Sequence, residues 1–385
     1  MNPPPQRFFG GLESLRGIAA LIVVLYHINR WPNPVTHCLF IGNGYLMVDL
    51  FFVLSGFVIC HNYLPKINCP HDIPGFMLLR FGRLYPLHLF FLITFLVLEV
   101  VKWAAELKFG FVPTQSHAFS MNNATSFLAH LLFIHPFFAF ADKTFDTPSW
   151  SIGVEFFTYL CFALIALAAG RRRISPVAGL LVLLAAVLLR HLGFAGLYVV
   201  TGLGTLMRCW LGFFTGVLAY QAHARYHPIL VRYSNKLGWG LLAGTGVFLS
   251  LKAVNVGWDY LTMALFGGII ILLAVPSDGS LVKTFNLPPL RWLGKVSYSM
   301  YLSHELVLIF TVRLLMFAKG ISLRHFPHHA SLLISVLGLL FVGLTVALVL
   351  AVSHFTYKWI ETPGRKEFKE LAAKWFKRKP AGVAT

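Results

Sequence analysis

Apolar runs long enough to cross a lipid bilayer recur along almost the whole sequence. A membrane-spanning helix needs about 20 predominantly apolar residues, and about ten runs approach that length. They fall at residues 12–29, 45–63, 83–103, 150–168, 175–191, 203–221, 237–253, 260–275, 295–316 and 331–355. The chain is 57% hydrophobic and 12% charged, more apolar than a soluble core requires. We therefore predict an all-α, polytopic membrane helix bundle with about ten transmembrane helices.

The basic residues predict the orientation of these helices. Residues 125–140 are apolar but short, and two histidines and a proline interrupt them. If this segment does not span, the later basic clusters, such as Arg171–Arg173, lie on the cytoplasmic side, as the positive-inside rule requires. We therefore expect an interfacial or re-entrant segment at 125–140 and cytoplasmic termini. Residues 1–360 would form a single membrane domain, followed by a basic tail at 361–385, either a solvated helix or a lipid-surface anchor.

The net charge of +18 comes from 32 Lys and Arg against 14 Asp and Glu. Such a balance is also found in nucleic-acid-binding proteins, but here the charges lie between apolar runs. They therefore indicate topology and contacts to anionic ligands, with no nucleic-acid partner. The five cysteines are scattered without a C-x-x-C pair, so the sequence supports neither a metal site nor a disulfide framework.

The first apolar run, residues 12–29, carries Arg16 and His27. Ionisable side chains in hydrocarbon are costly and usually face a cavity or a partner. Eleven helical steps return to nearly the same face, and they separate the two side chains by about 16 Å along the axis. We expect Arg16 to face a ligand near the cytoplasmic side. His27 would lie near the outer side as a general base, because an imidazole titrates near neutral pH. The alternative is an interfacial Arg and a helix-end His that bonds only to backbone or water.

The second run contains Asp49 and, deeper in the membrane, Ser55 and Gly56. Asp49 would lie at the level of His27, where a carboxylate could orient the imidazole; the alternative is an exposed interfacial Asp. The small residues Ser55 and Gly56 suit a close helix contact or a narrow channel.

Arg80 and Arg83 lie at the start of the third predicted helix, three residues apart, and share one helix face. Arg binds phosphate in a bidentate manner and keeps its charge. These side chains therefore suit an anionic ligand at the cytoplasmic side, although arginines here also satisfy the positive-inside rule.

The helix that begins near residue 150 carries Ser151, Glu155 and Tyr159 at a spacing of four. This spacing places them on one face. We expect Trp150 to mark the membrane interface and Glu155 to be an intramembrane acid at the depth of His27. A structural Glu that is hydrogen-bonded to Ser or Tyr is the alternative.

Further polar residues lie inside later runs. Tyr301 and His304 fall in mid-membrane, followed directly by Glu305, and Arg208 is another intramembrane cation. Polar clusters at this depth usually line a cavity. We therefore expect Arg208, Tyr301 and His304 to line a substrate cavity together with Ser55, Trp150 and Ser151.

Taken in order, these stretches resemble the acyltransferase-3 family of integral membrane acyltransferases. The resemblance runs from residue 11 to about residue 308. It rests on five segments with plausible spacing: the Arg16…His27 helix, VDLFFVLSGF, RFGRLYP, SWSIGVEFFTY and LGKVSYSMYLSHELVL.

This resemblance implies transfer of an acyl group, commonly acetyl from acetyl-CoA, to hydroxyls of extracytoplasmic glycans or related acceptors. It implies that His27 is catalytic and that Arg16, Arg80 and Arg83 contact the donor. Acyl-CoA would then be a co-substrate, with no permanently bound cofactor. Membrane lipids would surround the protein, most naturally in a bacterial cytoplasmic (inner) membrane. Two roles stay open for His27, because it could deprotonate the acceptor or first take the acyl group itself.

The main alternative is a transporter or flippase, in which Arg16, Arg208, Glu155 and His304 line a polar pathway. The order of the motifs disfavours it. A membrane protein without chemistry ranks last, because it gives no reason for so many intramembrane ionisable groups.

Overall fold

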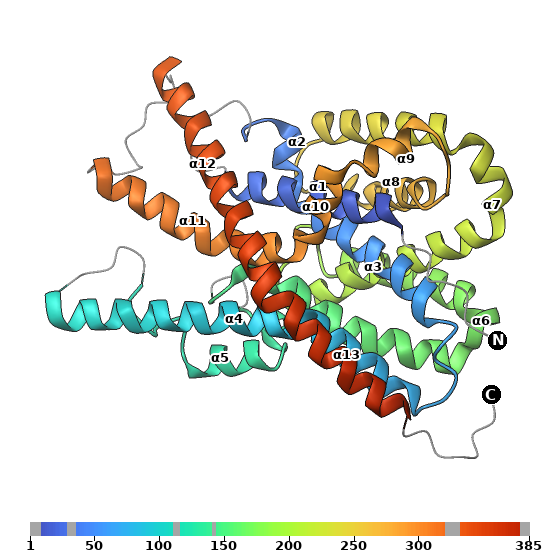
Figure 1. Cartoon of the computed structure of the whole chain (residues 1–385), viewed down its shortest axis with the longest axis horizontal. Coiled ribbons are helices and arrows are strands. Elements are labelled where there is room, and N and C mark those ends of the chain that lie inside the picture. Colours follow the sequence, from blue (N-terminus) through green and yellow to red (C-terminus); the bar gives the residue numbers. More distant parts are fainter. Residues whose placement is uncertain (1–8, 29–35, 111–115, 141–143, 320–331, 378–385) are drawn as a thin grey trace.

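All regular secondary structure in the described residues is helical, which agrees with the predicted class. The structure, a computed structural model, describes residues 9–28, 36–110, 116–140, 144–319 and 332–377 (Figure 1). Its α-helices are α1 (Gly10–His27), α2 (Leu39–Gly42), α3 (Met47–Tyr63), α4 (Asp72–Phe109), α5 (Ala124–Leu131), α6 (Trp150–His191), α7 (Leu203–Leu251), α8 (Asp259–Leu273), α9 (Ser280–Phe285), α10 (Pro288–Lys295), α11 (Ser297–Lys319), α12 (Leu332–Thr356) and α13 (Thr362–Lys377).

Several of these helices are long and apolar enough to cross a membrane. Within the described residues there are six such segments: Gly10–His27, Gly44–Tyr63, Asp72–Phe109, Thr147–His191, Leu203–Leu251 and Gly338–Trp375. The helix α8 is a shorter apolar helix of 15 residues. The protein is therefore a multi-pass membrane protein. The count of about ten crossings and the cytoplasmic placement of both termini stay predictions.

Each of the two longest helices contains two of the predicted apolar runs, joined at a kink. In α6 the break is at Gly170, whose φ of 64° belongs to the left-handed region that glycine tolerates. In α7 the break is at Tyr226, two residues before Pro228, and a proline inside a helix removes a backbone hydrogen bond. Figure 1 shows α7 turning back on itself. The difference between six long segments and ten predicted runs comes partly from these two kinks.

The segment predicted not to span, residues 125–140, forms two short helices. The helix α5 has eight residues, which extend about 12 Å, and the 3-10 helix η2 (His135–Phe137) follows it. Its histidines His130 and His135 are buried and stacked, with ring centroids 3.8 Å apart. An eight-residue helix is too short to cross the membrane.

Glycines let the helices around the centre of the bundle approach very closely. A Cβ atom on Gly56 of α3 would collide with the Phe213 carbonyl of α7, and one on Gly216 of α7 would collide with the Val53 carbonyl of α3. On the other side of the bundle, Gly17 of α1 lies against the backbone of α10. Small residues are typical of tightly packed membrane helices, and here they hold α1 and α3 at the centre.

The predicted basic tail begins with a helix that packs on the bundle. The chain passes from α12 through a π-helical turn (Tyr357–Glu361) into α13. One side of α13 packs on α4, where the rings of Phe368 and Phe81 lie 5.4 Å apart. The helix is therefore attached to the bundle along one side, while most of its other side chains are exposed. Whether the exposed side faces solvent or a lipid surface stays a prediction, and residues 378–385 of the predicted tail lie outside the described residues.

Candidate active site

A cavity of about 130 Å³ lies between α1, α3, α4, α6 and α11. Because these helices come from distant parts of the chain, the cavity collects residues from all five of the sequence segments discussed above. Seven of the predicted site residues line it: Arg16, Ser55, Arg80, Arg83, Ser151, Glu155 and Tyr301.

A small hydrogen-bonded group forms one wall of this cavity. Ser55 Oγ donates to Glu155 Oε1 at 2.5 Å, and the Tyr159 hydroxyl donates to the same oxygen at 2.6 Å. The neighbouring Gly56 brings α3 against α7, which leaves Ser55 on the side of α3 that reaches α6. Glu155 was expected at the depth of His27. The structure instead places it in the cavity that the three arginines line.

Arg80 and Arg83 are both held by aromatic and polar neighbours. Arg80 Nη2 donates to the Tyr63 hydroxyl at 2.6 Å, and its guanidinium lies 4.7 Å from the centre of that ring. Arg83 forms an ion pair with the buried carboxylate of Glu361, and its guanidinium lies 5.1 Å from the centre of the Tyr298 ring. Fixed orientations of this kind suit arginines that bind a ligand, since little side-chain freedom remains to be lost.

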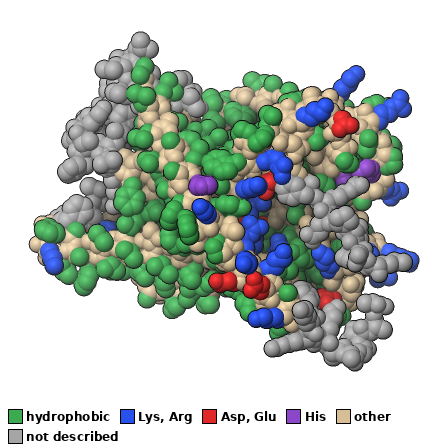
Figure 2. Space-filling view, viewed as in Figure 1, with side chains coloured by type: hydrophobic (Ala, Val, Ile, Leu, Met, Phe, Trp, Pro, Cys, Tyr) green, Lys and Arg blue, Asp and Glu red, His purple; other side chains and the backbone are tan. Residues whose placement is uncertain are grey.

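A larger pocket of about 800 Å³ continues from the cavity, and both spaces are lined by Arg16, Val58, Arg80 and Arg83. Figure 2 shows Lys and Arg side chains gathering beside α13 in the middle of this face, while hydrophobic side chains cover the part over α4. Burial and the nearby Arg80 lower the pKa of Lys66, another lining residue. The pocket is therefore strongly electropositive.

His27 does not line this cavity; its ring lies against that of His304, with centroids 4.8 Å apart. The Nδ1 atom of His27 is 2.9 Å from the Val23 carbonyl, and that of His304 is 2.6 Å from the Tyr301 carbonyl. A carbonyl oxygen can only accept, so each Nδ1 carries a proton and each neutral ring keeps its lone pair on Nε2. A histidine that acts as a general base through Nε2 requires this tautomer.

Tyr301 connects the histidine pair to the cavity. Its ring lies 5.9 Å from that of His304, and its hydroxyl lies 2.9 Å from that of Ser151, another residue that lines the cavity. His27, His304 and the cavity are therefore consecutive neighbours, with Tyr301 between the imidazoles and the arginines.

Asp49, which was expected to orient His27, instead forms an ion pair with Arg208. Arg208 donates to its two carboxylate oxygens at 2.9 and 2.7 Å, and both side chains are buried. The guanidinium also lies 5.1 Å from the centre of the Trp150 ring. Arg208 thus forms a buried ion pair away from the cavity lining. Trp150 is also buried, with 5% of its surface exposed, and neither it nor Arg208 lines the cavity as expected.

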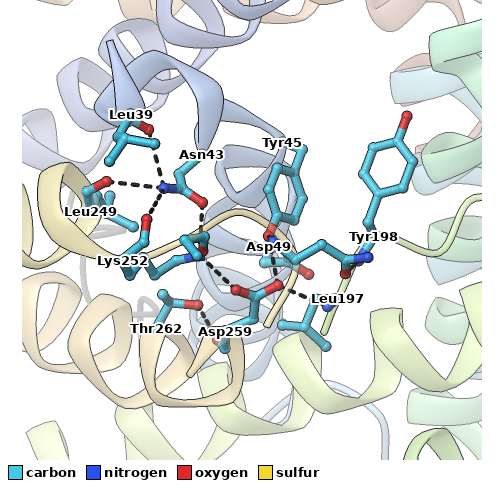
Figure 3. Close-up of polar contacts among 12 residues, drawn as sticks. Leu39, Asn43, Tyr45, Asp49, Leu197, Tyr198, Leu249, Lys252, Asp259 and Thr262 are labelled. Atoms are coloured by element: carbon cyan, nitrogen blue, oxygen red, sulfur yellow. Dashed lines mark hydrogen bonds and ion pairs between the residues drawn. The ribbon is translucent and has the colours of Figure 1, made fainter. Parts of the chain in front are cut away.

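A second buried ion pair lies next to the first and is shown in Figure 3. Lys252 Nζ donates to Asp259 Oδ1 at 2.6 Å and to Asn43 Oδ1 at 2.7 Å, and the Tyr45 hydroxyl donates to Asp259 Oδ2 at 2.6 Å. The Tyr45 carbonyl also accepts from Arg208. These contacts join the turn between α2 and α3 to the end of α7 and the start of α8, and they give Asp49 and Arg208 a structural setting.

The sequence reasoning missed several residues that line or support the site. Glu361 accepts from Arg83, from Arg365 at 3.2 Å and from Ser299 at 2.8 Å. Its position at the start of a predominantly basic tail was the only signal for it. Tyr63 and Tyr298 gave no signal, because aromatic residues are frequent throughout this sequence.

The chain was compared with known proteins. A family model described as an acyltransferase domain, Acyl_transf_3, matches residues 9–353. The chain is 28% identical to the putative peptidoglycan O-acetyltransferase YrhL of Bacillus subtilis, over 79% of this chain and 49% of that protein. It is 24% identical to the peptidoglycan O-acetyltransferase OatA of Listeria monocytogenes, over 98% of this chain and 60% of that protein.

A shorter match, 44% identical over 88 residues, joins 22% of this chain to protein 2 in the picA locus of Rhizobium radiobacter and covers 42% of that protein. The chain thus spans about half the length of these curated relatives. No solved structure matches it significantly. Because the family model covers nearly the whole helix bundle and the cavity at its centre, this chain belongs to the Acyl_transf_3 family of acyltransferase domains.

Proposed function

We propose that this protein transfers an acyl group, acetyl in the first instance, from acyl-CoA to a hydroxyl of an extracytoplasmic glycan. One observation carries the proposal: three arginines, Arg16, Arg80 and Arg83, converge on a cavity that leads through Tyr301 to a pair of histidines. Arginines recognise phosphate groups, and an imidazole is the most common general base. Family membership supports acyl transfer over the transporter or flippase alternative.

The sizes of the two spaces suit a donor of this kind. A pocket of about 800 Å³ lies within the usual range for ligand sites, and it would hold the phosphates and the nucleotide. The narrower cavity of about 130 Å³ would accept the flexible acyl-bearing arm. The acceptor would reach His27 from the opposite side, where the YrhL and OatA names make a peptidoglycan-type glycan the first acceptor to test.

The chain's own residues would then transfer one proton from the acceptor to the leaving group. In direct transfer, the acceptor hydroxyl gives its proton to His27 Nε2, a C–O ester bond forms and the C–S thioester bond breaks. The proton passes to the sulfur, so free CoA leaves as a thiol. The alternative is a covalent acyl-His27 intermediate, which the acceptor hydroxyl then resolves.

The test is release of free CoA thiol by membranes that contain the protein, given acetyl-CoA and a peptidoglycan-derived glycan. We expect His27→Ala to lower the rate about 10²- to 10⁴-fold, the usual contribution of general acid–base catalysis. His191→Ala is the matched control, because His191 is exposed at the end of α6. No thiol release from correctly folded wild-type protein would overturn the proposal, and full activity of His27→Ala would overturn the role of His27.

A further inference from the structure

The helix α13 is built into the wall of the electropositive pocket. A Cβ atom on Gly82 of α4 would collide with the Phe368 side chain, and one on Gly364 of α13 would collide with the Pro86 ring of α4. Near its other end, the Trp375 ring stacks on the His71 ring with centroids 5.6 Å apart. These contacts fix α13 along α4 over several turns, so its polar side has a defined position.

That polar side presents two cations to the pocket. Arg365 and Lys369 are four residues apart, so they share a helix face, and both line the pocket. The Arg365 guanidinium donates to Glu361 at 3.2 Å, but the side chain is still 44% exposed. It can therefore turn toward a ligand while one hydrogen bond keeps it in place.

The charges around the pocket are unbalanced. Among the described residues, six cations line it: Arg16, Lys66, Arg80, Arg83, Arg365 and Lys369. The carboxylate that lines it, Asp72, already accepts from the backbone amides of Asn68 and Cys69 at 3.0 and 3.1 Å. The Glu361 carboxylate is shared by Arg83 and Arg365. Like charges repel across such a space, and an anion with several phosphates would relieve that repulsion.

The position of these residues in the chain makes the observation independent of the family. The family model ends at residue 353, and the residues that the resemblance assigned to the donor lie between Arg16 and Arg83. Nothing in the matched region predicts that a helix after it would complete the pocket.

We propose that Arg365 and Lys369 bind phosphate groups of the donor, which makes α13 part of the donor site. The proposal rests on the proposed function for the identity of the donor as acyl-CoA. The binding claim itself does not depend on that identity. It states that the pocket binds a soluble polyphosphate-type anion and that α13 supplies two of the side chains that bind it.

The test is binding of inorganic pyrophosphate to the purified full chain in phosphatidylcholine nanodiscs, measured by calorimetry. We expect the double variant Arg365→Gln with Lys369→Gln to bind about tenfold or more weakly than wild type, since removing one charge-assisted hydrogen bond weakens binding by about that factor. The matched control is Lys366→Gln with Lys374→Gln, which removes the same charge from exposed positions of α13 that do not line the pocket. Gln keeps the helix propensity of Lys and Arg.

In the acyltransfer assay, the same double variant should raise the KM for acetyl-CoA about tenfold and leave the KM for the glycan unchanged. Equal pyrophosphate binding by wild type and double variant, or no binding by either, would overturn the role of α13 whatever the transfer assay gives. If adding phosphatidylglycerol to the nanodiscs abolishes the difference, the cations bind lipid headgroups and the proposal is wrong. Pyrophosphate binding without any thiol release would overturn the acyl-CoA function and leave the anion site standing.

Discussion

His27 of α1 and His304 of α11 lie with their rings 4.8 Å apart, and each holds its Nδ1 proton against a backbone carbonyl of its own helix. Each neutral ring therefore carries its basic lone pair on Nε2. His304 is fully buried and its Nε2 has no hydrogen-bond partner among the described residues. We therefore propose that His304 positions His27 or holds a proton beside it.

We expect His304→Asn to lower kcat about tenfold to 100-fold while the donor KM stays within a factor of two. Asn can still donate to the Tyr301 carbonyl but lacks the second nitrogen, so the variant keeps the local hydrogen bond and removes the base. Thiol release measured from pH 5.5 to 8.5 should show a displaced acidic limb. A uniform loss at every pH, together with a lower thermal stability, would instead indicate a purely structural histidine.

Glu361→Gln removes the charged partner of Arg83, so the guanidinium should lose its fixed orientation toward the pocket. We expect the KM for acetyl-CoA to rise about tenfold to 100-fold, because a hydrogen bond to a charged group contributes about 1.5–3 kcal/mol. Glu367→Gln is the control, since Glu367 is exposed on α13. An unchanged donor KM would show that Arg83 does not contact the donor.

Asp49→Asn should act on stability before it acts on catalysis. The substitution leaves Arg208 buried without its counter-charge, and breaking a buried pair costs about 3–5 kcal/mol. We expect a clearly lower melting temperature in detergent and a normal donor KM for the folded fraction. The double variant Asp49→Leu with Arg208→Met should recover part of the loss, and Asp278→Asn at an exposed position should change nothing. A higher donor KM with an unchanged melting temperature would contradict this structural role and would indicate that Asp49 acts in the active site.

Gly56→Ala should force α3 and α7 apart, because the new Cβ would meet the Phe213 carbonyl and backbone cannot move aside cheaply. Overpacking of this kind costs about 1–3 kcal/mol, although alanine itself favours the helix. Gly244→Ala on α7 provides the comparison, since a Cβ there meets no atom within 4 Å. Thermal unfolding should therefore separate the two variants, and equal melting temperatures would contradict the close approach of the two helices.

Acid should destabilise the fold through His130 and His135. Burial, followed by the neighbouring His88 for His130 and by His130 for His135, lowers the pKa of each ring below its ordinary value. Below about pH 6.5 these histidines are protonated in the unfolded chain but stay neutral in the folded chain. The folding free energy therefore becomes less favourable as the pH falls. The melting temperature should drop between pH 7.5 and 5.5, and less steeply in His130→Gln. His191→Gln, at an exposed position, should follow the wild-type slope.

Much of the fold could be predicted from the sequence, because apolar runs of membrane length permit few structures other than helices. The same reasoning found Arg16, Arg80, Arg83 and Glu155, since ionisable residues are rare in such runs, and all four line one cavity with Ser55. The kinks in α6 and α7 were visible only indirectly, as short gaps between predicted spans.

Partners across the bundle were beyond the sequence. Spacing along one helix places side chains on a common face, but it does not say which other helix that face meets. Asp49 therefore appeared free to orient His27, whereas α3 packs so closely on α7 that its carboxylate meets Arg208. Likewise, the sequence indicated only that Glu361 and Arg365 belong to a basic tail. The packing of α13 on α4 brings them to the pocket.

The sequence by itself determined that this is a helical membrane protein with a histidine and several arginines set inside its helices, because periodicity and hydropathy are local properties. Only the tertiary structure decided that His27 pairs with His304, that Glu155 joins the arginines, and that a helix after residue 361 closes the pocket. Those relations depend on contacts between residues up to hundreds of positions apart, and only the packing of the helices sets them.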